Sequence, residues 1–337
     1  MGQRVYESIL NQKRTVPGNN RLFAKILGTV LLFLFLLPYI ITSLFGNVNH
    51  STIGGTLNLL LNGLEKDLAD SSIYIENTTT AGRERLPLEI YLLDKLSRSI
   101  NPDYQLEALK AQAILLRTAL MEELWENSGN IRGTVRINDH EYGQGLLNED
   151  IVIAIASTRG VFLTYDDKPA KVAYFAVSNG RTRDGSEAFG QGVLPYFKAV
   201  DCNRDFLAEN FTSQKTMTKN EFTAAIESHA LISLTNDFSL DDISINRDLS
   251  GYVIDVTINN QTEAVVLSGE ECRQIWGLSS SSFSIDENRN RIVFSVRGIG
   301  HGLGMSQFAA NEMAKNGNDY ISILEYFFSG LMLTKFE

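Results

Sequence analysis

The sequence predicts an α+β fold in which helices and antiparallel strands are mixed, preceded by one N-terminal transmembrane helix. Apolar residues recur at helical spacing in residues 87–125 and again at 306–330. Residues 131–205 and 251–298 instead carry short runs rich in Val, Ile, Phe and Tyr, with Gly, Asp and Asn at the predicted turns. Because the two patterns do not alternate regularly, and no internal repeat is visible, α+β is favoured over a parallel α/β sheet.

Residues 26–45 form an uncharged apolar run that is long enough for a membrane-spanning helix. About 20 such residues cross a bilayer core, and membrane helices tolerate an internal proline such as Pro38. A cleaved signal peptide would have a shorter apolar region and a small-x-small cleavage site, which residues 43–48 do not offer. A buried core helix of this length would carry a polar stripe. We therefore expect a retained anchor.

Basic residues flank this predicted anchor on its N-terminal side. Residues 1–25 contain five basic residues and one acidic residue, and the first Lys or Arg after the span is Lys66. Because Lys and Arg mark the cytoplasmic side, we expect a single-pass protein of the cell membrane with residues 1–25 as a cytoplasmic tail. Outside the cell, residues 46–85 would be a juxtamembrane stalk with a first strand. Residues 86–337 would be the main domain, and an insertion is one interpretation of its polar stretch 206–250.

Charge and cysteine content narrow the class of partner. The net charge is −10 and residues 1–25 carry +4, so the remainder carries −14. Such an acidic domain argues against nucleic acid, and against attachment to anionic wall polymers or lipids by charge alone. Cys202 and Cys272 could form one disulfide outside a cell or remain two thiols. The cysteines and the histidines at positions 50, 140, 229 and 301 lack zinc-ligand spacing, so no metal or cofactor is expected.

Helical spacing predicts two helices early in the main domain. Pro87 opens the first, and its buried face would carry Leu88, Tyr91, Leu92, Leu96 and Ile100. Asn101-Pro102 ends it, and a second helix follows through residues 107–125 with a buried stripe of Leu109, Ala113, Leu116 and Leu120. Later helices are predicted at 220–232, at 306–317 and, with Asp319 as N-cap, at 319–330.

The densest candidate for chemistry is the loop 298–307, GIGHGLGMSQ, in which four glycines surround His301. Glycines let the backbone approach a ligand closely, and the loop leads into a helix N-terminus, which favours anionic groups. His301 could move a proton or hold a sugar hydroxyl. The alternative is a tight strand-to-helix turn with Ser306 as N-cap and His301 as a core residue. Spacing alone does not separate these interpretations.

Two other polar segments are candidates. Glu107, Lys110 and Arg117 lie roughly on one face of the second helix, with Gln112 off that face, and periodicity alone favours a solvated face. Residues 178–182, SNGRT, form a polar loop after a predicted strand. The sequence contains no nucleophile elbow, phosphate loop, HExxH or paired-carboxylate signature. The residues by themselves therefore predict an anchored extracellular α+β domain with a glycine-histidine loop.

At these segments the sequence resembles the stage II sporulation protein D (SpoIID) family, which includes the LytB-type amidase enhancers. The resemblance rests on LPLEIYL, LEALKAQAILLRT, SNGRT with GSEAFG, LPYFKAVD, LSGEECRQIWGLSSSSF and VRGIGHGLGMSQFAANEMAKNG, in the family's order over residues 86–330. It implies work on peptidoglycan, because the sporulation members are lytic transglycosylases that cut glycan strands during engulfment. In that chemistry one carboxylic acid protonates the glycosidic oxygen and then acts as a base.

The sequence departs from the family at the catalytic position. The family's Glu precedes the lysine of ALKAQA by eleven residues, and counting back from Lys110 gives Ser99. Serine cannot protonate a leaving group at neutral pH. A second departure precedes SNGRT, where Phe175 and Ala176 replace the family's usual His-Ser pair. The positions that match the family pattern, and that the resemblance implies contact substrate, are Lys110, Gln112, Arg117, Arg181, His301, Ser306 and Gln307.

Three hypotheses follow from this combination. The first is an inactive relative, a pseudoenzyme that binds peptidoglycan glycan strands or recruits a partner such as another cell-wall hydrolase or a sporulation membrane protein. The second is an active lytic transglycosylase with a displaced carboxylate at Asp94, Asp103 or Glu107. The third is a structural scaffold without glycan affinity. The serine at position 99 favours the first.

Overall fold

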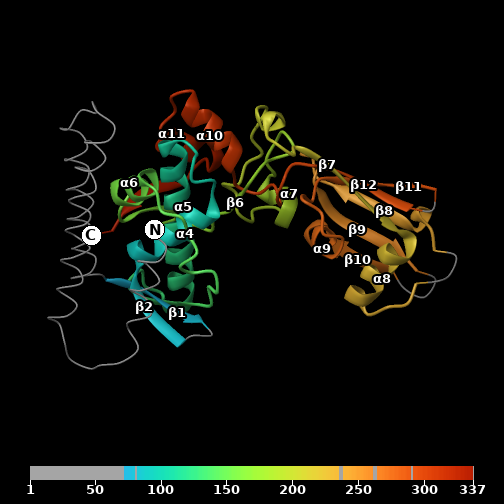
Figure 1. The fold of residues 1–337 in the computed structure, drawn as a ribbon, viewed down its shortest axis with the longest axis horizontal. Coiled ribbons are helices and arrows are strands. Elements are labelled where there is room, and N and C mark those ends of the chain that lie inside the picture. The colour runs from blue at the N-terminus through green and yellow to red at the C-terminus, as the bar shows by residue number, and fades with distance from the viewer. Residues whose placement is uncertain (1–71, 80–81, 235–237, 261–263, 290, 337) are drawn as a thin grey trace, which may run out of the picture. The chain divides into compact units, whose positions relative to one another are not determined.

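The computed structural model describes residues 72–79, 82–234, 238–260, 264–289 and 291–336 (Figure 1). Contacts within the chain divide it into residues 1–57 and 58–337, and every described residue belongs to the second unit. The predicted anchor at 26–45 and the tail before it lie outside the described residues. Among the described residues, no helix is both long enough and apolar enough to cross a membrane.

The α+β prediction is confirmed, because helices and strands are interleaved irregularly along the chain (Figure 1). The helices are α4 (Leu88–Ser99), α5 (Leu106–Ser128), α6 (Glu149–Ser157), α7 (Gly185–Phe189), α8 (Lys219–Ala230), α9 (Gly269–Ile275), α10 (Gln307–Lys315) and α11 (Tyr320–Phe327). Two 3-10 turns are η1 (Asp205–Leu207) and η2 (Leu240–Asp242). The first strands are β1 (Ile73–Thr79), β2 (Gly82–Pro87), β3 (Gly133–Ile137), β4 (Val161–Tyr165), β5 (Lys168–Pro169) and β6 (Tyr174–Phe175). The later strands are β7 (Thr212–Thr218), β8 (Ile243–Arg247), β9 (Val253–Asn259), β10 (Ala264–Ser268), β11 (Phe283–Asn288), β12 (Arg291–Arg297), β13 (Met305–Ser306) and β14 (Met332–Lys335).

The strands form small sheets, most of them antiparallel as predicted. The sheet orders are β2-β1-β3, β14-β4-β5, β13-β6, β10-β9-β8 and β11-β12-β7. Two pairings are parallel, β1 with β3 and β6 with β13. The second of these joins residues 131 positions apart, since Met305 lies opposite Tyr174 and Ser306 opposite Phe175. This pairing brings the glycine-histidine loop beside the strand that precedes SNGRT.

Helix α5 lies between two of the apolar clusters of the described residues and contributes side chains to both. It packs against α4, α6, α10 and α11, and it ends at Gly129, which takes a left-handed conformation as C-cap. Buried residues occur around its whole circumference, including Ala108, Leu109, Gln112, Leu115 and Arg117. The predicted stripe of Leu109, Ala113 and Leu116 is buried, but the opposite face is buried as well. The expectation of a solvated polar face on this helix was therefore wrong.

Three clusters of buried apolar side chains support these elements. The first lies between α4, α5, α6 and the β1–β3 sheet, and the second lies between α5, α10, α11 and β4. The third is built from residues 217–296 around Trp276, whose ring stacks on Phe222 with centroids 4.9 Å apart. This third cluster contains residues from before and after position 250. The interpretation of residues 206–250 as an insertion therefore stays a prediction.

Residues 131–205 contain less strand than their composition predicts. The run 171–177 forms only the two-residue β6, because its partner β13 is itself a short piece of a glycine-rich loop. Residues 149–157 fold instead as α6, where the Asn148 side chain accepts a hydrogen bond from the Ile151 amide. Helices α10 and α11 begin where predicted, with Ser306 and Asp319 as N-caps.

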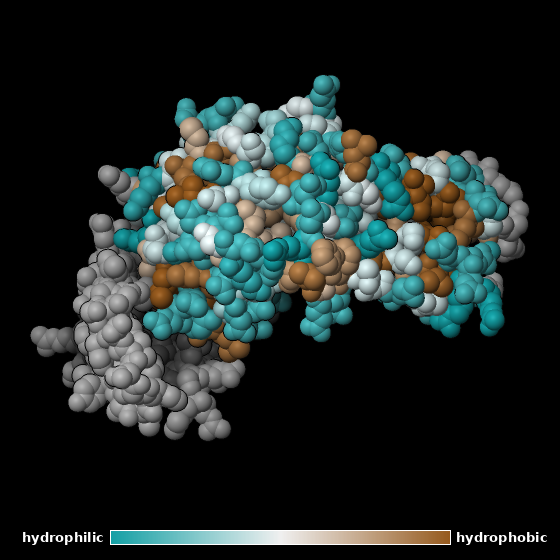
Figure 2. Space-filling model, turned by 90° about the horizontal axis from the view of Figure 1, so that it is seen from above, coloured by the Kyte–Doolittle hydropathy of each residue, from teal (hydrophilic) through white to brown (hydrophobic). Residues whose placement is uncertain are grey.

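The surface that Figure 2 presents is mostly hydrophilic, with hydrophobic residues in several separate patches. Large apolar side chains that are strongly exposed include Leu146, Phe206, Leu231 and Leu249, which lie in turns or short loops. Single exposed apolar residues are normal on protein surfaces. Polar and charged side chains are therefore better indicators of a functional site than these exposed apolar residues.

Candidate functional site

Ser99 is the last residue of α4, and the chain becomes extended at Ile100. The Ser99 hydroxyl donates to the Leu96 carbonyl at 3.2 Å, and the residue is half-buried. Its carbonyl accepts a hydrogen bond of 2.6 Å from Gln307 Nε2. The position that the family resemblance assigns to a catalytic acid is therefore held by contacts to α4 and α10.

Two glutamine amides meet beside Ser99. Gln307 Nε2 lies 3.2 Å from Gln112 Oε1, which joins α10 to α5. Gln112 is fully buried, and its Nε2 has no hydrogen-bond partner among the described residues. A buried amide donor without a partner costs free energy unless a water or a ligand satisfies it. This amide pair connects three helices at one end of the predicted site.

Tyr174 completes this cluster from β6. Burial raises the pKa of its phenol, against a smaller lowering effect of the Ser99 side chain, so the phenol is neutral at physiological pH. Sequence analysis did not single out Tyr174, because a tyrosine within a strand-like run indicates a core residue. We refer to Ser99, Gln112, Tyr174 and Gln307 as the Ser99 cluster.

His301 is next to this cluster, because its imidazole interacts with the backbone of Tyr174. Its Nδ1 accepts a hydrogen bond of 3.1 Å from the Leu303 amide, so the neutral ring carries its proton on Nε2. Burial lowers the pKa of His301, which favours this neutral form. The Phe175 ring packs against the imidazole with centroids 5.6 Å apart. His301 is therefore a neutral, oriented side chain.

The glycines around His301 have a packing reason. At Gly302 and Gly304 the backbone has φ near +80°, a region that side chains rarely adopt. A Cβ at Gly302 would collide with the Tyr252 ring, and a Cβ at Gly304 would collide with the Ala173 carbonyl. The loop thus needs glycine to pack between β6 and Tyr252, whether or not a ligand approaches it.

An ion pair on α9 influences the pKa of His301. Arg273 Nη2 lies 2.6 Å from Glu270 Oε1, and this pairing lowers the pKa of Glu270 against the opposing effect of burial. The Glu270 charge in turn raises the pKa of His301, although burial has the larger effect. Sequence reasoning missed this pair, and the spacing Glu-x-x-Arg on a helix was the available signal.

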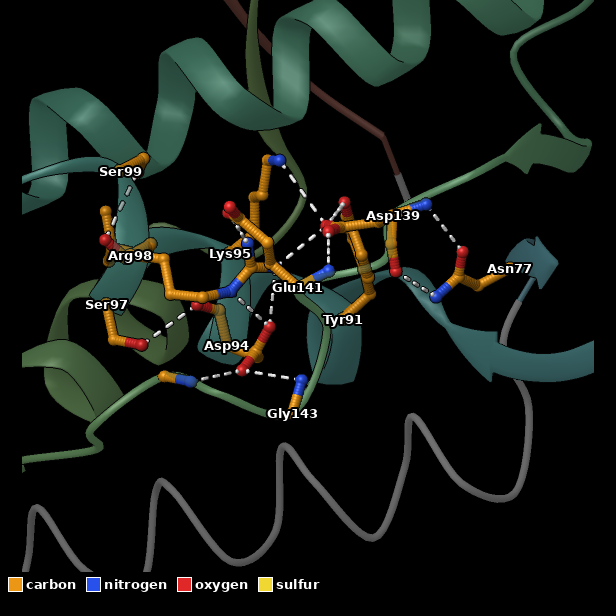
Figure 3. Close-up of polar contacts among 12 residues, drawn as sticks. Asn77, Tyr91, Asp94, Lys95, Ser97, Arg98, Ser99, Asp139, Glu141 and Gly143 are labelled. Carbon is orange, nitrogen blue, oxygen red and sulfur yellow. Dashed lines mark hydrogen bonds and ion pairs between the residues drawn. The ribbon is translucent and has the colours of Figure 1, made fainter. Parts of the chain in front are cut away.

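Two of the three carboxylates proposed as displaced acids already accept hydrogen bonds from protein donors. Asp94 Oδ1 accepts from the amides of Gly143 at 3.0 Å and Gly145 at 2.9 Å, while its Oδ2 accepts from Arg98 (Figure 3). The oxygens of Glu107 accept from Lys110 Nζ at 2.6 Å and from the Tyr320 amide at 3.0 Å. Asp103 is different, because it is exposed in the turn between α4 and α5.

A network of ion pairs surrounds Arg98 (Figure 3). Arg98 Nη2 lies 2.7 Å from both Asp94 Oδ2 and Asp139 Oδ2, and the Tyr91 hydroxyl donates to Asp139 at 2.8 Å. These donors overcome the effect of burial and lower the pKa of Asp139 to about 2. The network ties the loop after β3 to α4.

Several predicted binding residues lie outside the Ser99 cluster. Lys110 pairs with Glu107 beside α11. Arg117 is fully buried, with Nε and Nη2 on the two oxygens of Glu89 at 2.8 and 2.7 Å and Nη1 on the Val161 carbonyl at 2.9 Å. Arg181 is exposed and lies 3.6 Å from Asp201. Of these residues, Arg117 has contacts that support the fold and leave its guanidinium inaccessible to solvent.

Ser306 is buried at a second polar centre. Its hydroxyl donates to Asp205 Oδ2 at 2.7 Å and accepts from the Ala309 amide as the α10 N-cap. The Ser178 amide donates to the same Asp205 oxygen at 2.7 Å, which joins the SNGRT loop to α10. Burial raises the pKa of Asp205, and its other oxygen has no partner among the described residues. Asp205 was not predicted, because one Asp in a polar stretch carries no pattern.

The two cysteines are free thiols in the structure. Cys202 belongs to the cluster around α5 and α11, and Cys272 belongs to the cluster around Trp276. Burial raises the pKa of the Cys272 thiol to about 12, and burial also raises the pKa of Cys202. The open question of a disulfide is thus decided in favour of two separate thiols.

The Ser99 cluster and His301 together offer amide, phenol, hydroxyl and imidazole groups, all of them neutral. Such groups can donate to and accept from the hydroxyls of a sugar. Among the described contacts of Ser99, none involves a carboxyl group. The arrangement can therefore hold a polar ligand, but Ser99 supplies no proton donor for glycosidic cleavage.

Comparison with known proteins finds a family model that matches part of the chain and relatives that match most of it. Residues 76–165 match the family model SpoIID, described as stage II sporulation protein. Stage II sporulation protein D of Bacillus subtilis (strain 168) is 29% identical over 282 residues, covering 78% of this chain and 79% of the relative. The Bacillus amyloliquefaciens protein of the same name is 28% identical over 294 residues, covering 81% and 82%.

A more distant relative carries a different name. The amidase enhancer of Bacillus subtilis (strain 168) is 23% identical over 278 residues, covering 69% of this chain and 39% of the relative. The family-model match includes Ser99, Gln112 and the Arg98 network, whereas the matches to whole relatives extend over most of the chain. Residues 76–165 therefore form a SpoIID-family domain, and most of the chain is similar to stage II sporulation protein D and, more distantly, to the amidase enhancer.

Proposed function

We propose that this chain acts in sporulation as a membrane-anchored wall protein that binds peptidoglycan glycan strands or recruits a wall hydrolase, and does not cut the glycan itself. The family membership supports a role in sporulation and the cell wall. The uncharged run at residues 26–45 supports the anchor. In this proposal the described domain lies outside the membrane, next to the wall.

The observation that carries the proposal is the environment of Ser99. A lytic transglycosylase needs a carboxylic acid with a proton to give to the glycosidic oxygen. At this position the chain has a hydroxyl that donates to Leu96, with a neighbouring glutamine amide and a tyrosine phenol. These groups do not exchange protons readily near neutral pH, since the phenol pKa is raised and amides do not titrate.

The occupied carboxylates support the same conclusion. Both oxygens of Asp94 and both oxygens of Glu107 already accept hydrogen bonds from protein donors. Using either group as an acid would require breaking ion pairs of 2.6–2.8 Å. Asp103 is the carboxylate that remains exposed close to Ser99 in sequence, so it represents the active alternative.

Glycan binding is supported by the polar groups that remain at the cluster. The unpartnered Gln112 Nε2 is a buried donor, and Gln307 already bridges two elements. Recruitment of a hydrolase is supported by the name of one relative, the amidase enhancer of Bacillus subtilis. Glycan binding and recruitment can coexist on one anchored domain.

Digestion of purified sacculi tests the proposal most directly. The purified full chain is incubated with sacculi, and released anhydro-muropeptides are measured by mass spectrometry. We expect no release above background, together with co-sedimentation of the chain with sacculi. Robust release by the native chain would overturn the loss of catalysis, and Asp103→Asn would then show whether Asp103 is the acid. A folded chain that does not co-sediment would contradict glycan binding.

The substitution Ser99→Glu tests the missing acid. We expect Ser99→Glu to release anhydro-muropeptides that the native chain does not release, because it restores a carboxyl group at the end of α4. Ser99→Gln is the matched control, since it has the same size without a titratable group. Equal inactivity of both variants, with circular dichroism spectra like the native chain, would show that more than the acid has been lost.

The anchor has its own test. A membrane-impermeant amine-reactive reagent applied to intact cells should label lysines of the described domain, and the chain should stay with membranes after alkaline carbonate extraction. Lack of labelling in intact cells, with labelling in lysed cells, would contradict the proposed location.

A further inference from the structure

A polar groove of about 670 Å³ lies on the β7-β12-β11 sheet and is separate from the Ser99 cluster. Its wall comes from β7, β11 and β12, together with the turn after β8. The volume is within the range of small-ligand sites, about 300–1,000 Å³. The groove shares no residue with the Ser99 cluster or the glycine-histidine loop, so the proposed function leaves it unused.

Hydroxyl and amide side chains are aligned across this sheet. Ser284 on β11 lies opposite Ser295 on β12, and Ser295 lies opposite Gln214 on β7. Arg297 comes two positions after Ser295 on β12, so the two side chains are on the same face of the sheet. Arg297 lies opposite Thr212 on β7. All five residues line the groove. Their register makes a row of hydrogen-bonding groups that runs across three strands.

Two arginines give the groove its charge. Arg247 is held in place by hydrogen bonds from its guanidinium to the carbonyls of Phe283 at 2.6 Å and Gly251 at 3.4 Å. Arg297 is exposed, and its side chain has no ion-pair or hydrogen-bond partner among the described residues. The groove lining contains no Asp or Glu, although the chain as a whole has a net charge of −10.

This contrast in charge points to an anionic ligand. Acidic residues outnumber basic residues 40 to 30 in the chain, so a cavity that presents two guanidinium groups without an acid is a local exception. Guanidinium groups bind carboxylates through planar, often bidentate, hydrogen bonds. The serine, threonine and glutamine side chains beside them suit the hydroxyls and amides of a ligand that is polar along its length.

We infer that this groove is a second binding site, for a carboxylate-bearing sugar-peptide fragment of peptidoglycan, with the carboxylate on Arg297 and Arg247 and the sugar or peptide amides on the aligned serines and Gln214. The inference rests on the proposed function for the choice of peptidoglycan. The charge and the hydrogen-bonding groups stand independently of it. Two sites on one chain would engage the glycan at the Ser99 cluster and a peptide-bearing unit at the groove.

Binding of muramyl dipeptide to the full chain tests the inference. It is measured by isothermal titration calorimetry, with chitotriose as an uncharged sugar and with muramyl dipeptide whose one free carboxylate is amidated. We expect the native chain to bind muramyl dipeptide and to bind the amidated compound roughly tenfold or more weakly, because charge-assisted hydrogen bonds are lost. Equal affinity for the charged and amidated compounds would overturn the inference.

Arg297→Gln is the main variant, because the Arg297 side chain has no internal partner whose loss would disturb folding. We expect roughly tenfold weaker binding of muramyl dipeptide. The matched control is Arg291→Gln, which changes an exposed arginine on the same strand and the same face, about 20 Å away along β12. An unchanged affinity in Arg297→Gln, or equal losses in both variants, would contradict the assignment.

The source of the anion is decided by competition. In this experiment a short poly(glycerol phosphate) competes with muramyl dipeptide for the chain. If the polymer displaces muramyl dipeptide and binds more tightly than it does, the groove binds a phosphate polymer and the inference is overturned. Sacculus co-sedimentation is measured in parallel. Retention on sacculi without muramyl dipeptide binding would refute the groove while leaving the proposed function intact, whereas a folded native chain that is not retained on sacculi would contradict the glycan binding in the proposed function.

Discussion

The end of α4 separates two polar regions of opposite character. On one side, Arg98 joins Asp94 and Asp139 in a network where each carboxylate accepts several hydrogen bonds (Figure 3). On the other side, beginning one residue later, Ser99 meets the neutral amides of Gln307 and, through it, Gln112. The first region keeps its acids and the second has none, although they share a helix end.

The difference shows how to tell a structural polar group from a binding group. Carboxylates whose oxygens are filled by protein donors stabilise the fold and present nothing to a ligand. A neutral cluster with an unpartnered donor can exchange hydrogen bonds with ligand hydroxyls at little cost. By this criterion Asp94 and Arg117 belong to the fold, whereas Gln112 and Gln307 belong to the candidate site.

The largest expected effect is at Arg117, which tests the structural side of the comparison. Arg117→Met should lower the free energy of unfolding by about 3–5 kcal/mol, because it leaves the Glu89 charge buried without its partner. Urea unfolding followed by circular dichroism measures it. The control is Arg181→Met, which changes an exposed arginine and should cost about 0.5 kcal/mol or less. Similar values for both would show that burial of the pair does not matter.

A smaller effect is expected at Asp139, and it depends on pH. The folded-state pKa is about 2, below the ordinary value of 3.8, so folding favours the ionised carboxylate. The resulting stabilisation of about 2 kcal/mol is complete above pH about 4 and disappears as the pH falls through about 2. Asp139→Asn should therefore be less stable than the native chain at pH 7, and the difference should shrink with acidification.

Urea titrations of both proteins between neutral pH and pH about 2 check this dependence. Glu141→Gln is a suitable control, because Glu141 is exposed and its contact to Arg98 is longer, at 3.4 Å. A stability difference for Asp139→Asn that stays constant with pH would contradict the role assigned to the ionised carboxylate.

The smallest effect on stability, and the sharpest effect on binding, is expected at Gln307. Gln307→Ala should cost about 1 kcal/mol of unfolding free energy, because it removes bonds to the Ser99 carbonyl and to Gln112. It should also reduce co-sedimentation with sacculi, since the Ser99 cluster loses a donor. Asn316→Ala provides a control at the opposite end of α10, where the side chain donates only to the nearby Glu312 carbonyl. Unchanged sacculus binding in Gln307→Ala would place the glycan elsewhere.

Local sequence signals predicted much of the helical part of the fold. The apolar spacing of α4 and the caps of α10 and α11 depend on neighbouring residues, so they can be recognised without tertiary contacts. The same reasoning failed on α5, where the spacing of Glu107, Lys110 and Arg117 suggested a solvated face. Arg117 is buried because Glu89, 28 residues earlier on α4, supplies its counter-charge, and no local pattern contains that information.

The candidate site was predicted only in part. The resemblance to the family pointed to Ser99, Gln112, Gln307 and His301, and the structure brings the first three into hydrogen-bond contact. Tyr174 was missed because its contact with Ser99 depends on the pairing of β6 with β13. Asp205 was missed for a similar reason, since its partners Ser178 and Ser306 come from distant segments.

Sequence alone determined the α+β class, the positions of the main helices, the acidic character of the chain and the serine at the family's acid position. The first three follow from composition and local periodicity, and the last follows from the family resemblance and one count along the chain. Only the tertiary structure decided which polar groups are saturated by partners and which are left to bind. Gln307 and Ser99 are 208 residues apart, so their contact exists only after the chain has folded and packed α10 against α4 and α5.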